Sequence, residues 1–222
     1  MTRYSWCVSE HRRTDARAKA VGRKRRPVSE EVLVPSDRDV RGTLDSPDAE
    51  ACVVACPPHP QMGGSRSDRL LRAVSDAVDC ACLRFDYGAW SEGRGELADV
   101  RDALAWARDR YGTVALFGYS FGGCLALVAA AAESETGRSP SAAAALSPAD
   151  RLSSNIDAAA AIEDIDCPVA VVYGRRDTTV DAEAVAEPVE AAGGAVETLD
   201  ADHFFVGQAE KAAERVGRLL IR

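Results

Sequence analysis

The chain has 222 residues, of which 46% are hydrophobic and 28% are charged. This length and composition are typical of a globular protein with one or two domains. No apolar run approaches the ~18 residues that a membrane span requires, which argues against a membrane protein. The Arg pairs near the N-terminus are not followed by an apolar segment, so we expect no signal peptide and a cytoplasmic location.

Charge divides the chain into two unequal parts. Residues 1–27 contain nine Lys or Arg residues and two acidic residues. Residues 28–222 contain 18 Lys or Arg residues and 33 acidic residues. The basic part lacks apolar periodicity, which predicts a disordered extension. Contact of this extension with nucleic acid or anionic lipid is a less favoured alternative, and a true start after the extension is another. The acidic part, where Lys211 is the only lysine, resembles proteins of salt-loving archaea or an ordinary acidic cytosolic protein. We expect it to form one folded domain that binds nucleic acid poorly.

The number and spacing of the cysteines favour free thiols over disulfides or a metal site. An odd number of cysteines and no expected signal peptide argue against a disulfide framework. The spacings Cys52-x3-Cys56 and Cys80-x-Cys82 are compatible with zinc, but each pair lies in an apolar run with strand-like alternation. We therefore predict that these side chains are small buried hydrophobic groups. The seven cysteines are Cys7, Cys52, Cys56, Cys80, Cys82, Cys124 and Cys167.

Predicted strands and helices alternate along the acidic part. The strands fall at 28–34, 40–44, 51–56, 80–85, 113–117, 142–146, 169–173 and 195–199. The helices fall at 67–78, 96–111, 122–132, 181–192 and 206–220, with room for a short helix around 156–162. This alternation predicts an α/β fold, a mostly parallel sheet of about seven or eight strands covered on both faces. Ligands of such sheets bind at the carboxyl ends of the strands.

One serine lies between two glycines where a predicted strand meets a predicted helix. The segment Gly118-Tyr119-Ser120-Phe121-Gly122 matches the pattern G-x-S-x-G in the context that gives this pattern meaning. The glycines let backbone segments approach where a Cβ would clash, so the serine sits on a strained turn with Oγ exposed. The N–H groups of the following helix favour negative charge at the same place. A plain Gly-rich turn is the alternative for this motif alone.

A serine nucleophile needs a base, and the chain offers three histidines. His11 lies in the basic segment, and His59 lies in a Pro-rich loop. Only His203 follows a predicted strand late in the chain. We therefore predict His203 as the base of Ser120, with a surface loop histidine as the alternative.

The base needs a carboxylate that fixes its tautomer and stabilises the imidazolium. Asp177 lies in the loop after the strong strand 169–173. Asp166 and Asp181 are rivals, and Asp181 looks more like the cap of the helix that follows it. Each predicted catalytic residue stands just beyond a strand, in the chain order Ser120, Asp177, His203, which is specific in combination.

An oxyanion hole needs two N–H donors set around the developing charge. The residue after the serine, Phe121, supplies one. The loop 59–64 supplies the other, and since Pro60 has no N–H, we choose Gln61, with Met62 as second choice. His59 is expected to hold the shape of this loop.

Several segments together resemble small α/β-hydrolases of the dienelactone-hydrolase-like group, over roughly residues 28–222. These segments read "PPHPQMGGSRSDRLLRAVSDAV", "LRFDYGAWSEGRGELADVRDALAWA", "LFGYSFGG", "VVYGRRDTTV" and "DADHFF". The resemblance implies the α/β-hydrolase fold. True dienelactone hydrolases use a cysteine where this chain has Ser120, so dienelactone specificity is not implied. Many relatives carry an Arg-Gly pair in the loop after the "RFD" strand, whereas residues 86–93 contain no arginine here.

The surroundings of the predicted site indicate an open and shallow cleft. Only about 20 residues separate the predicted strands 142–146 and 169–173, too few for the helical lid of many relatives. Tyr87 and Trp90 either line the mouth of the site or pack on the next helix. With His59 and Tyr119 they are the candidate substrate-binding residues.

These observations predict a serine hydrolase that cleaves a small-molecule ester or thioester through an acyl-enzyme. Carboxylesterase is the leading activity and thioesterase the next. An acyltransferase on the same triad, a small-peptide hydrolase and a catalytically silent binding protein are the alternatives. No metal or organic cofactor is expected, and the oligomeric state is left open.

Overall fold

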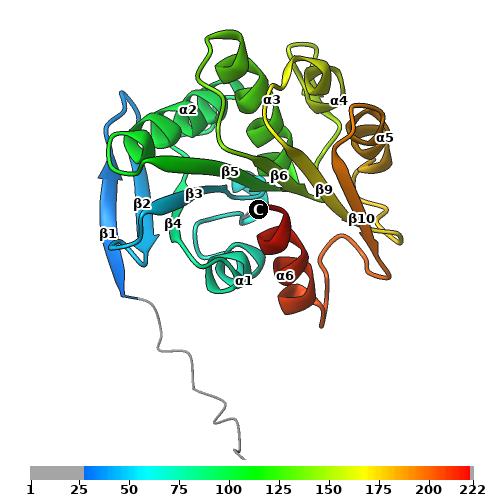
Figure 1. Cartoon of the computed structure of the whole chain (residues 1–222), viewed down its shortest axis with the longest axis horizontal. Helices are drawn as coiled ribbons and strands as arrows, with labels where there is room; N and C mark the ends of the chain where they lie inside the picture. The colour runs from blue at the N-terminus through cyan, green and yellow to red at the C-terminus, as the bar shows by residue number, and fades with distance from the viewer. Residues whose placement is uncertain (1–27, 221–222) are drawn as a thin grey trace, which may run out of the picture.

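An eight-stranded sheet runs through residues 28–220, the part of the chain that this computed structural model describes (Figure 1). The predicted basic extension, with His11 and Cys7, lies outside the described residues. The strand order is β1-β2-β4-β3-β5-β6-β9-β10, and every pairing from β4 to β10 is parallel. The strands are β1 (Ser29–Val34), β2 (Val40–Asp45), β3 (Ala51–Cys56), β4 (Ala81–Asp86), β5 (Thr113–Tyr119), β6 (Ala143–Leu146), β9 (Val169–Gly174) and β10 (Ala195–Leu199).

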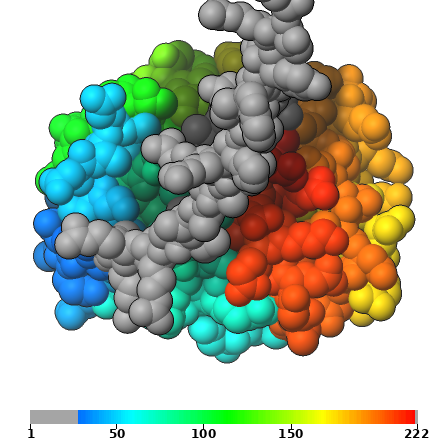
Figure 2. All heavy atoms as spheres, turned by 60° about the horizontal axis from the view of Figure 1, so that its bottom comes forward, coloured from blue at the N-terminus to red at the C-terminus, as the bar shows by residue number. Residues whose placement is uncertain are grey.

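Helices cover both faces of this sheet, which confirms the predicted α/β class. Helices α1 and α6 lie on one face, and α2, α3, α4 and α5 lie on the opposite face (Figure 1). The helices are α1 (Arg69–Ala77), α2 (Arg94–Arg108), α3 (Phe121–Glu135), α4 (Ala158–Ala161), α5 (Glu183–Ala191) and α6 (Ala209–Leu220). Helices α1 and α6 lie side by side in the view of Figure 2, and charged side chains of both helices line the groove between them.

The central strands are apolar because both of their faces are buried. In β3, Val54 packs into the core beneath α2 and α3, and its neighbour Val53 packs into the core beneath α1 and α6. Helix α1 forms because Asp68 accepts hydrogen bonds from the Leu70 and Leu71 N–H groups, and because its buried side chains share one stripe. Burial of each large side chain contributes roughly 1.5–3 kcal/mol.

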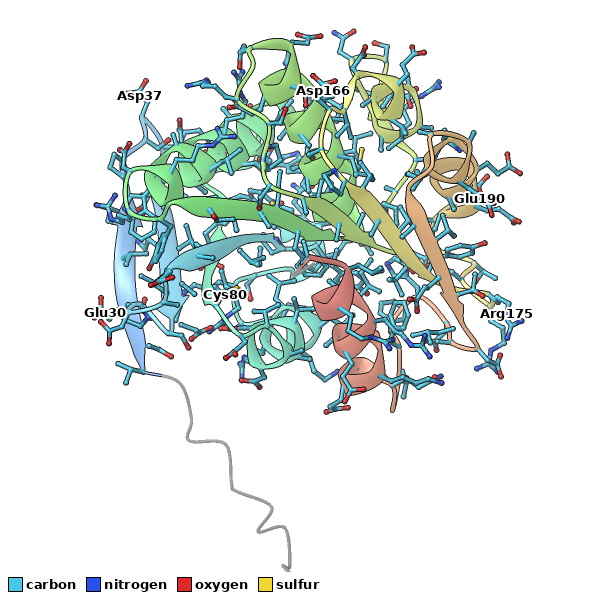
Figure 3. All side chains as sticks on the ribbon, viewed as in Figure 1. Glu30, Asp37, Cys80, Asp166, Arg175 and Glu190 are labelled. Carbon is cyan, nitrogen blue, oxygen red and sulfur yellow. The ribbon has the colours of Figure 1, made fainter. Side chains whose placement is uncertain are left out.

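Many charged side chains lie on the surface of the molecule. Figure 3 shows Glu30 of β1, Asp37 of the turn after β1 and Glu190 of α5 projecting outward. A charge taken inside is paired: Arg84 of β4 donates from Nε to the buried Asp45 carboxylate of β2 at 2.7 Å. The distribution agrees with an acidic surface around an apolar interior.

The segment between β6 and β9 differs from the prediction. It opens with a hairpin of β7 (Arg151–Ser153) and β8 (Ile156–Asp157), and the helix over 156–162 shrinks to α4 and a 3-10 turn at Ile162–Asp164. The Arg151 side chain donates to Asp157 at 2.6 Å across the hairpin, a pairing that helical periodicity does not reveal. These pieces form no lid over the sheet edge.

The last helix begins at Ala209 rather than at residue 206. Phe205 has φ of +49° and Gly207 has φ of +71°, and an α-helix cannot pass through left-handed residues. Among residues 28–220 no helix is both long and apolar enough to cross a bilayer.

Of the four cysteines predicted to be buried, Cys52, Cys56 and Cys82 are buried, whereas Cys80, just before β4, is only partly buried. Cys52 and Cys82 lie on opposite faces of neighbouring strands, and the six described cysteines are free thiols. Burial raises the pKa of Cys52 to about 12 and that of Cys80 to about 11. The protonated thiol is a poor ligand and a poor nucleophile.

Candidate active site

Ser120 occupies a strained turn between β5 and α3. Its φ is +55°, a conformation that residues with a side chain rarely adopt. A Cβ on Gly118 would lie 2.0 Å from the Gly122 carbonyl oxygen, and a Cβ on Gly122 would lie 2.3 Å from the Pro57 carbonyl oxygen. Both glycines are therefore required by close backbone contact, as the motif predicts.

The structure brings together the three residues predicted as a triad. Ser120 Oγ lies 3.0 Å from His203 Nε2, and His203 Nδ1 lies 2.7 Å from Asp177 Oδ2. The His203 and Asp177 side chains are only 5% and 3% exposed. Because a carboxylate only accepts hydrogen bonds, Nδ1 carries the ring proton and Nε2 can accept the serine proton.

Asp177 is kept ionised by its hydrogen bonds. Burial raises the pKa of this carboxyl, but hydrogen bonds from His203, the Thr179 N–H and Ser147 outweigh burial, and the net shift is downward. The Thr179 and Val180 N–H groups donate to Oδ1 at 2.9 and 3.3 Å. The second carboxylate oxygen is thereby left to His203.

The histidine loop is tied to its neighbours on both sides. The Tyr119 hydroxyl donates to the His203 carbonyl oxygen at 3.1 Å, so this candidate substrate-binding residue instead supports the loop from below. The Arg176 N–H donates to the Ala201 carbonyl oxygen at 2.9 Å, which joins the acid loop to the histidine loop. These bonds set the distance between the two side chains.

The rival aspartates lie in other roles. Asp181 accepts from the Ala184 N–H at 3.2 Å, at the start of α5, as expected of a helix cap. Asp166, labelled in Figure 3, is exposed and precedes β9, whereas Asp177 follows the other end of this strand.

The loop after β3 already uses the N–H groups that the sequence analysis chose for the oxyanion hole. The Gln61 N–H donates to His59 Nδ1 at 3.2 Å, and the Met62 N–H donates to the His59 carbonyl oxygen at 3.0 Å. Phe121 is the first residue of α3, so its N–H has no acceptor within the helix. His59 holds the loop by capping it, as predicted.

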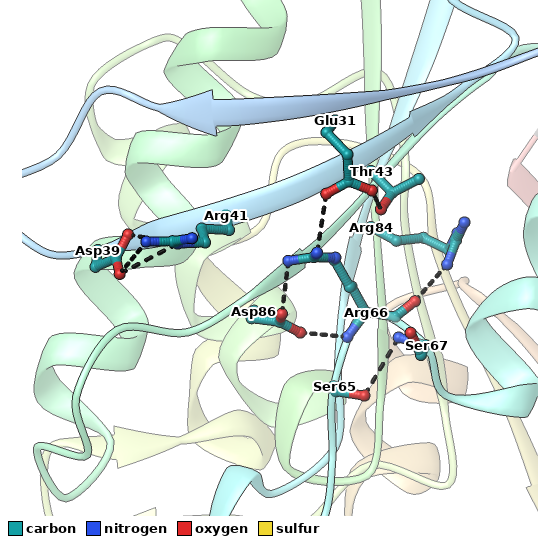
Figure 4. Close-up of polar contacts among 9 residues, drawn as sticks. All are labelled: Glu31, Asp39, Arg41, Thr43, Ser65, Arg66, Ser67, Arg84 and Asp86. Carbon is teal, nitrogen blue, oxygen red and sulfur yellow. Dashed lines mark hydrogen bonds and ion pairs between the residues drawn. The ribbon is translucent and has the colours of Figure 1, made fainter.

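A pair of arginines anchors the far end of the same loop. The Arg66 N–H and guanidinium both donate to the Asp86 carboxylate, at 2.6 and 2.8 Å, and Arg66 also reaches Glu31 of β1 (Figure 4). Arg84 of β4 donates to the Arg66 carbonyl oxygen. Both ends of the loop are thus fixed to the sheet.

Aromatic rings form one wall beside the serine. The centroid of the Trp90 ring lies 4.6 Å from that of the His59 ring and 5.8 Å from that of the Phe121 ring. The His59 and Phe121 ring centroids are 4.8 Å apart. Tyr87 is buried and donates to the Pro57 carbonyl oxygen at 3.1 Å, so it packs inside the wall rather than lining the mouth. Trp90 is 38% exposed.

Exposed apolar side chains gather at the same edge of the sheet. Met62 is 80% exposed in the loop after β3, and Phe204 is 58% exposed directly after His203. The Phe204 ring meets the His203 imidazole edge to face, with centroids 5.3 Å apart. Large exposed apolar groups around a triad indicate a surface for the apolar part of a ligand.

Two residues of the site were missed by sequence reasoning. Ser147, just after β6, is fully buried with φ of +38°, and its hydroxyl lowers the pKa of Asp177 although it makes no hydrogen bond of ordinary geometry. Arg38, in the β1–β2 turn, reaches the loop after β4. A signal existed only for Ser147, since it follows a strand whose carboxyl end borders the serine.

Comparisons with known proteins agree with this fold. An α/β serine hydrolase homologue from Coxiella burnetii has a TM-score of 0.70 at 22% identity, covering 85% of this chain and 96% of that one. A Xanthomonas campestris protein described as an α/β serine hydrolase without a lid gives 0.66 at 24% identity, covering 84% and 94%. An esterase from Pyrococcus furiosus gives 0.72 at 18% identity, covering 87% and 90%.

At these identities the structures establish the α/β-hydrolase fold. No curated protein sequence matches the chain. The sequence profile of the dienelactone hydrolase family matches residues 87–210, more than half of the chain and the part that holds Ser120, Asp177 and His203. The chain therefore belongs to the dienelactone hydrolase family and is a hydrolase.

Proposed function

We propose that this hydrolase is a serine esterase with Ser120, His203 and Asp177 as its catalytic triad. The single observation that carries the proposal is the continuous contact from Ser120 Oγ through His203 to Asp177, at 3.0 and 2.7 Å. Fold stability gives no reason to align a serine, a histidine and an aspartate in one buried chain of hydrogen bonds, whereas nucleophilic catalysis requires this alignment. Residues 28–222 would form the catalytic domain.

In the proposed reaction, Ser120 Oγ attacks the substrate carbonyl while His203 Nε2 takes the serine proton. Asp177 holds the imidazole and stabilises its positive charge. The Phe121 N–H is the first oxyanion donor. The Gln61 N–H is the second, because its long bond to His59 Nδ1 is weak and exchanges for a stronger bond to an oxyanion. His203 then protonates the leaving group, and a water molecule releases the acid by the same steps in reverse.

A small ester is the substrate class that the site favours, and a thioester is next. Within residues 28–220 the short pieces between β6 and β9 form no lid, which leaves the acyl-enzyme open to water and favours hydrolysis over transfer to another acceptor. The exposed apolar side chains of Met62, Trp90 and Phe204 suit the apolar part of such a substrate. Several solved structures of this fold are named esterases, in line with this choice.

Labelling with a fluorophosphonate probe tests the proposal. We expect the wild-type protein to be labelled and to hydrolyse 4-nitrophenyl acetate, and Ser120→Ala to do neither. Folded wild-type protein that resists the probe at both low and high salt would contradict the triad and favour a binding protein. A panel of esters and thioesters, with and without a competing alcohol acceptor, then separates esterase, thioesterase and transferase.

A further inference from the structure

We propose that Arg38 is a positioning residue that holds Trp90 in place as one wall of the substrate site. Trp90 lies in the loop 87–93 between β4 and α2, and Arg38 comes from the turn between β1 and β2. The kinetic consequence rests on the proposed function. The structural consequence, the fixed position of Trp90, does not.

Arg38 joins the loop to helix α2. Its Nε donates to the buried Asp99 carboxylate at 2.7 Å, and Nη2 donates to the Ala89 carbonyl oxygen at 2.6 Å. Nη2 also lies 3.5 Å from the buried Glu96 carboxylate. One guanidinium therefore connects the backbone of the residue before Trp90 to two acids on the helix.

The two acids hold the rest of the loop. Asp99 Oδ2 accepts from the Gly88 N–H at 2.9 Å. Glu96 accepts from the Ser91 and Gly93 N–H groups, both at 2.8 Å. The backbone is thus held by charged groups on both sides of Trp90, and charge-assisted hydrogen bonds are the stronger kind.

Two glycines leave the space that the guanidinium fills. A Cβ on Gly95 would lie 2.2 Å from Arg38 Nη1, and a Cβ on Gly88 would lie 2.9 Å from Arg38 Cβ. The loop has no arginine of its own, and the side chain inside it arrives from a hairpin about fifty residues earlier. The sequence around the loop is built to admit a side chain from elsewhere.

Fold stability alone does not account for this cluster. Burial raises the pKa of the Asp99 carboxyl more than Arg38 and the Gly88 N–H lower it. Buried ion pairs often contribute little net stability, because removal of the charges from water offsets their attraction. What the cluster provides is one fixed loop conformation.

The fixed loop borders the reacting groups. The Trp90 ring contacts His59, whose Nδ1 accepts from the Gln61 N–H, and it contacts Phe121, the residue after the nucleophile. A displaced Trp90 would loosen His59 and open the wall beside the acyl group. We therefore expect loss of Arg38 to act through Trp90, mainly on substrate binding.

A kinetic double-mutant cycle tests this route. In Arg38→Met we expect KM for 4-nitrophenyl butyrate to rise about tenfold, with kcat within about threefold. In the Trp90→Ala background the same change should add less than about twofold, because the contact it supports is gone. If the Arg38 and Trp90 substitutions acted independently, so that their factors on KM multiplied in the double variant, the proposal would be overturned.

Arg41→Met is the matched control. Arg41 lies three residues from Arg38 and pairs only with its neighbour Asp39 in the contacts of Figure 4, and both side chains are about two-thirds exposed. We expect its KM and kcat to stay within about twofold of wild type. If KM rose equally in both arginine variants, the cause would be the loss of positive charge from the hairpin, and the proposed role of Arg38 would be wrong.

Tryptophan fluorescence tests the position of Trp90 without any substrate. We expect acrylamide to quench the emission of Arg38→Met about twofold more than that of wild type, and we expect no difference between Trp90→Phe and the Arg38→Met/Trp90→Phe double variant. Unchanged quenching in a folded Arg38→Met protein would overturn the proposal. If that variant does not fold by circular dichroism, Arg38→Lys, which keeps the charge but loses the fork, takes its place. A wild-type protein that lacks esterase activity would defeat the proposed function and leave this fluorescence test valid.

Discussion

Two loops border Ser120 and are held by different forces. The turn 118–122 is fixed by backbone contact, because glycines at both ends leave no space for any side chain. The loop 87–93 is fixed by side chains, through an arginine from a distant hairpin and two buried acids. The first arrangement needs only backbone atoms, those of the turn and of Pro57 after β3, whereas the second needs particular side chains from distant positions.

This difference matters for function because the two loops have different tasks. The nucleophile must stand in one position for any acyl substrate, so a rigid steric solution suits it. The wall that contacts the substrate determines which groups fit, and a loop held by a few side chains can be changed without loss of the nucleophile. We therefore expect substitutions in the first loop to abolish the site and substitutions in the second to retune it.

Substitution of Gly122 by alanine should break the steric arrangement and have the largest effect. The new Cβ would stand 2.3 Å from the Pro57 carbonyl oxygen, so either the oxyanion loop or the serine turn must move. We expect a loss of about 3 kcal/mol in the free energy of unfolding and no labelling by a fluorophosphonate. Chemical denaturation and probe labelling measure the two effects.

Gly112→Ala is the matched control for this substitution. Gly112 precedes β5 and has no atom within 4 Å of the position of a Cβ. Its stability should change by less than about 0.5 kcal/mol, with labelling intact. If Gly122→Ala were as active as this control, the turn would owe its shape to something other than backbone contact.

Asp177→Asn should have the next largest effect. The Asp177 carboxylate is held both by nearby backbone and by a side chain from another loop. Its Oδ1 accepts from backbone N–H groups of its own turn, and its Oδ2 is bound by His203. Asparagine keeps the shape but no longer stabilises an imidazolium, so we expect kcat to fall by on the order of 10³–10⁴ with KM little changed. Steady-state kinetics on an activated ester measures the loss, and a fall below about tenfold would argue against Asp177 as the acid.

The same variant tests how the ionised Asp177 carboxylate contributes to the stability of the fold at different pH values. The pKa of Asp177 is lower in the folded protein than its ordinary value of about 3.9 in an unfolded chain. The carboxylate therefore stabilises the fold fully above about pH 5, and this contribution is lost as pH falls through the lower folded pKa. The stability gap between wild type and Asp177→Asn should narrow between pH 5 and pH 2, which urea titrations would follow.

The parts of the fold that depend on local pattern were predictable. Apolar runs such as 51–56 and 169–173 are buried on both faces, and their alternation with amphipathic helices specified the sheet. The small hairpin at 151–157 was missed, because its pairing depends on an ion pair between Arg151 and Asp157 rather than on periodicity. Positive φ at residues 205 and 207 shortened the last helix for a similarly local reason.

The candidate site divides in the same way. The geometry of Ser120, Asp177 and His203 followed from motif, chain order and the shared sheet edge. Arg38 was invisible, because contacts between a hairpin and a helix about sixty residues apart leave no spacing rule in the sequence. Chain order also does not show that His59 already binds the N–H of Gln61.

Ser147→Ala should have the smallest effect and tests whether the acid needs a third support. The hydroxyl is fully buried, lies after β6 and lowers the pKa of Asp177, yet it makes no hydrogen bond of ordinary geometry at rest. Alanine at φ of +38° is as strained as serine, so the change removes the hydroxyl alone. We expect kcat to fall about two- to fivefold, because a weak bond to a charged group contributes about 0.5–1 kcal/mol.

Ser134→Ala separates this role from a loss of packing. Ser134 is also a buried serine, but it lies at the end of α3 remote from Ser120, where it donates to the Ala130 carbonyl oxygen at 2.9 Å and accepts from the Asp166 N–H at 3.1 Å. Its replacement removes the acceptor of the Asp166 N–H and of the Ser139 hydroxyl and the donor to Ala130, so it should lower stability by about 1 kcal/mol and leave kcat unchanged. Ser147→Ala should do the reverse, lowering kcat more than stability. If both variants lost stability alone, Ser147 would belong to the core, and the acid would be held only by His203 and its own turn.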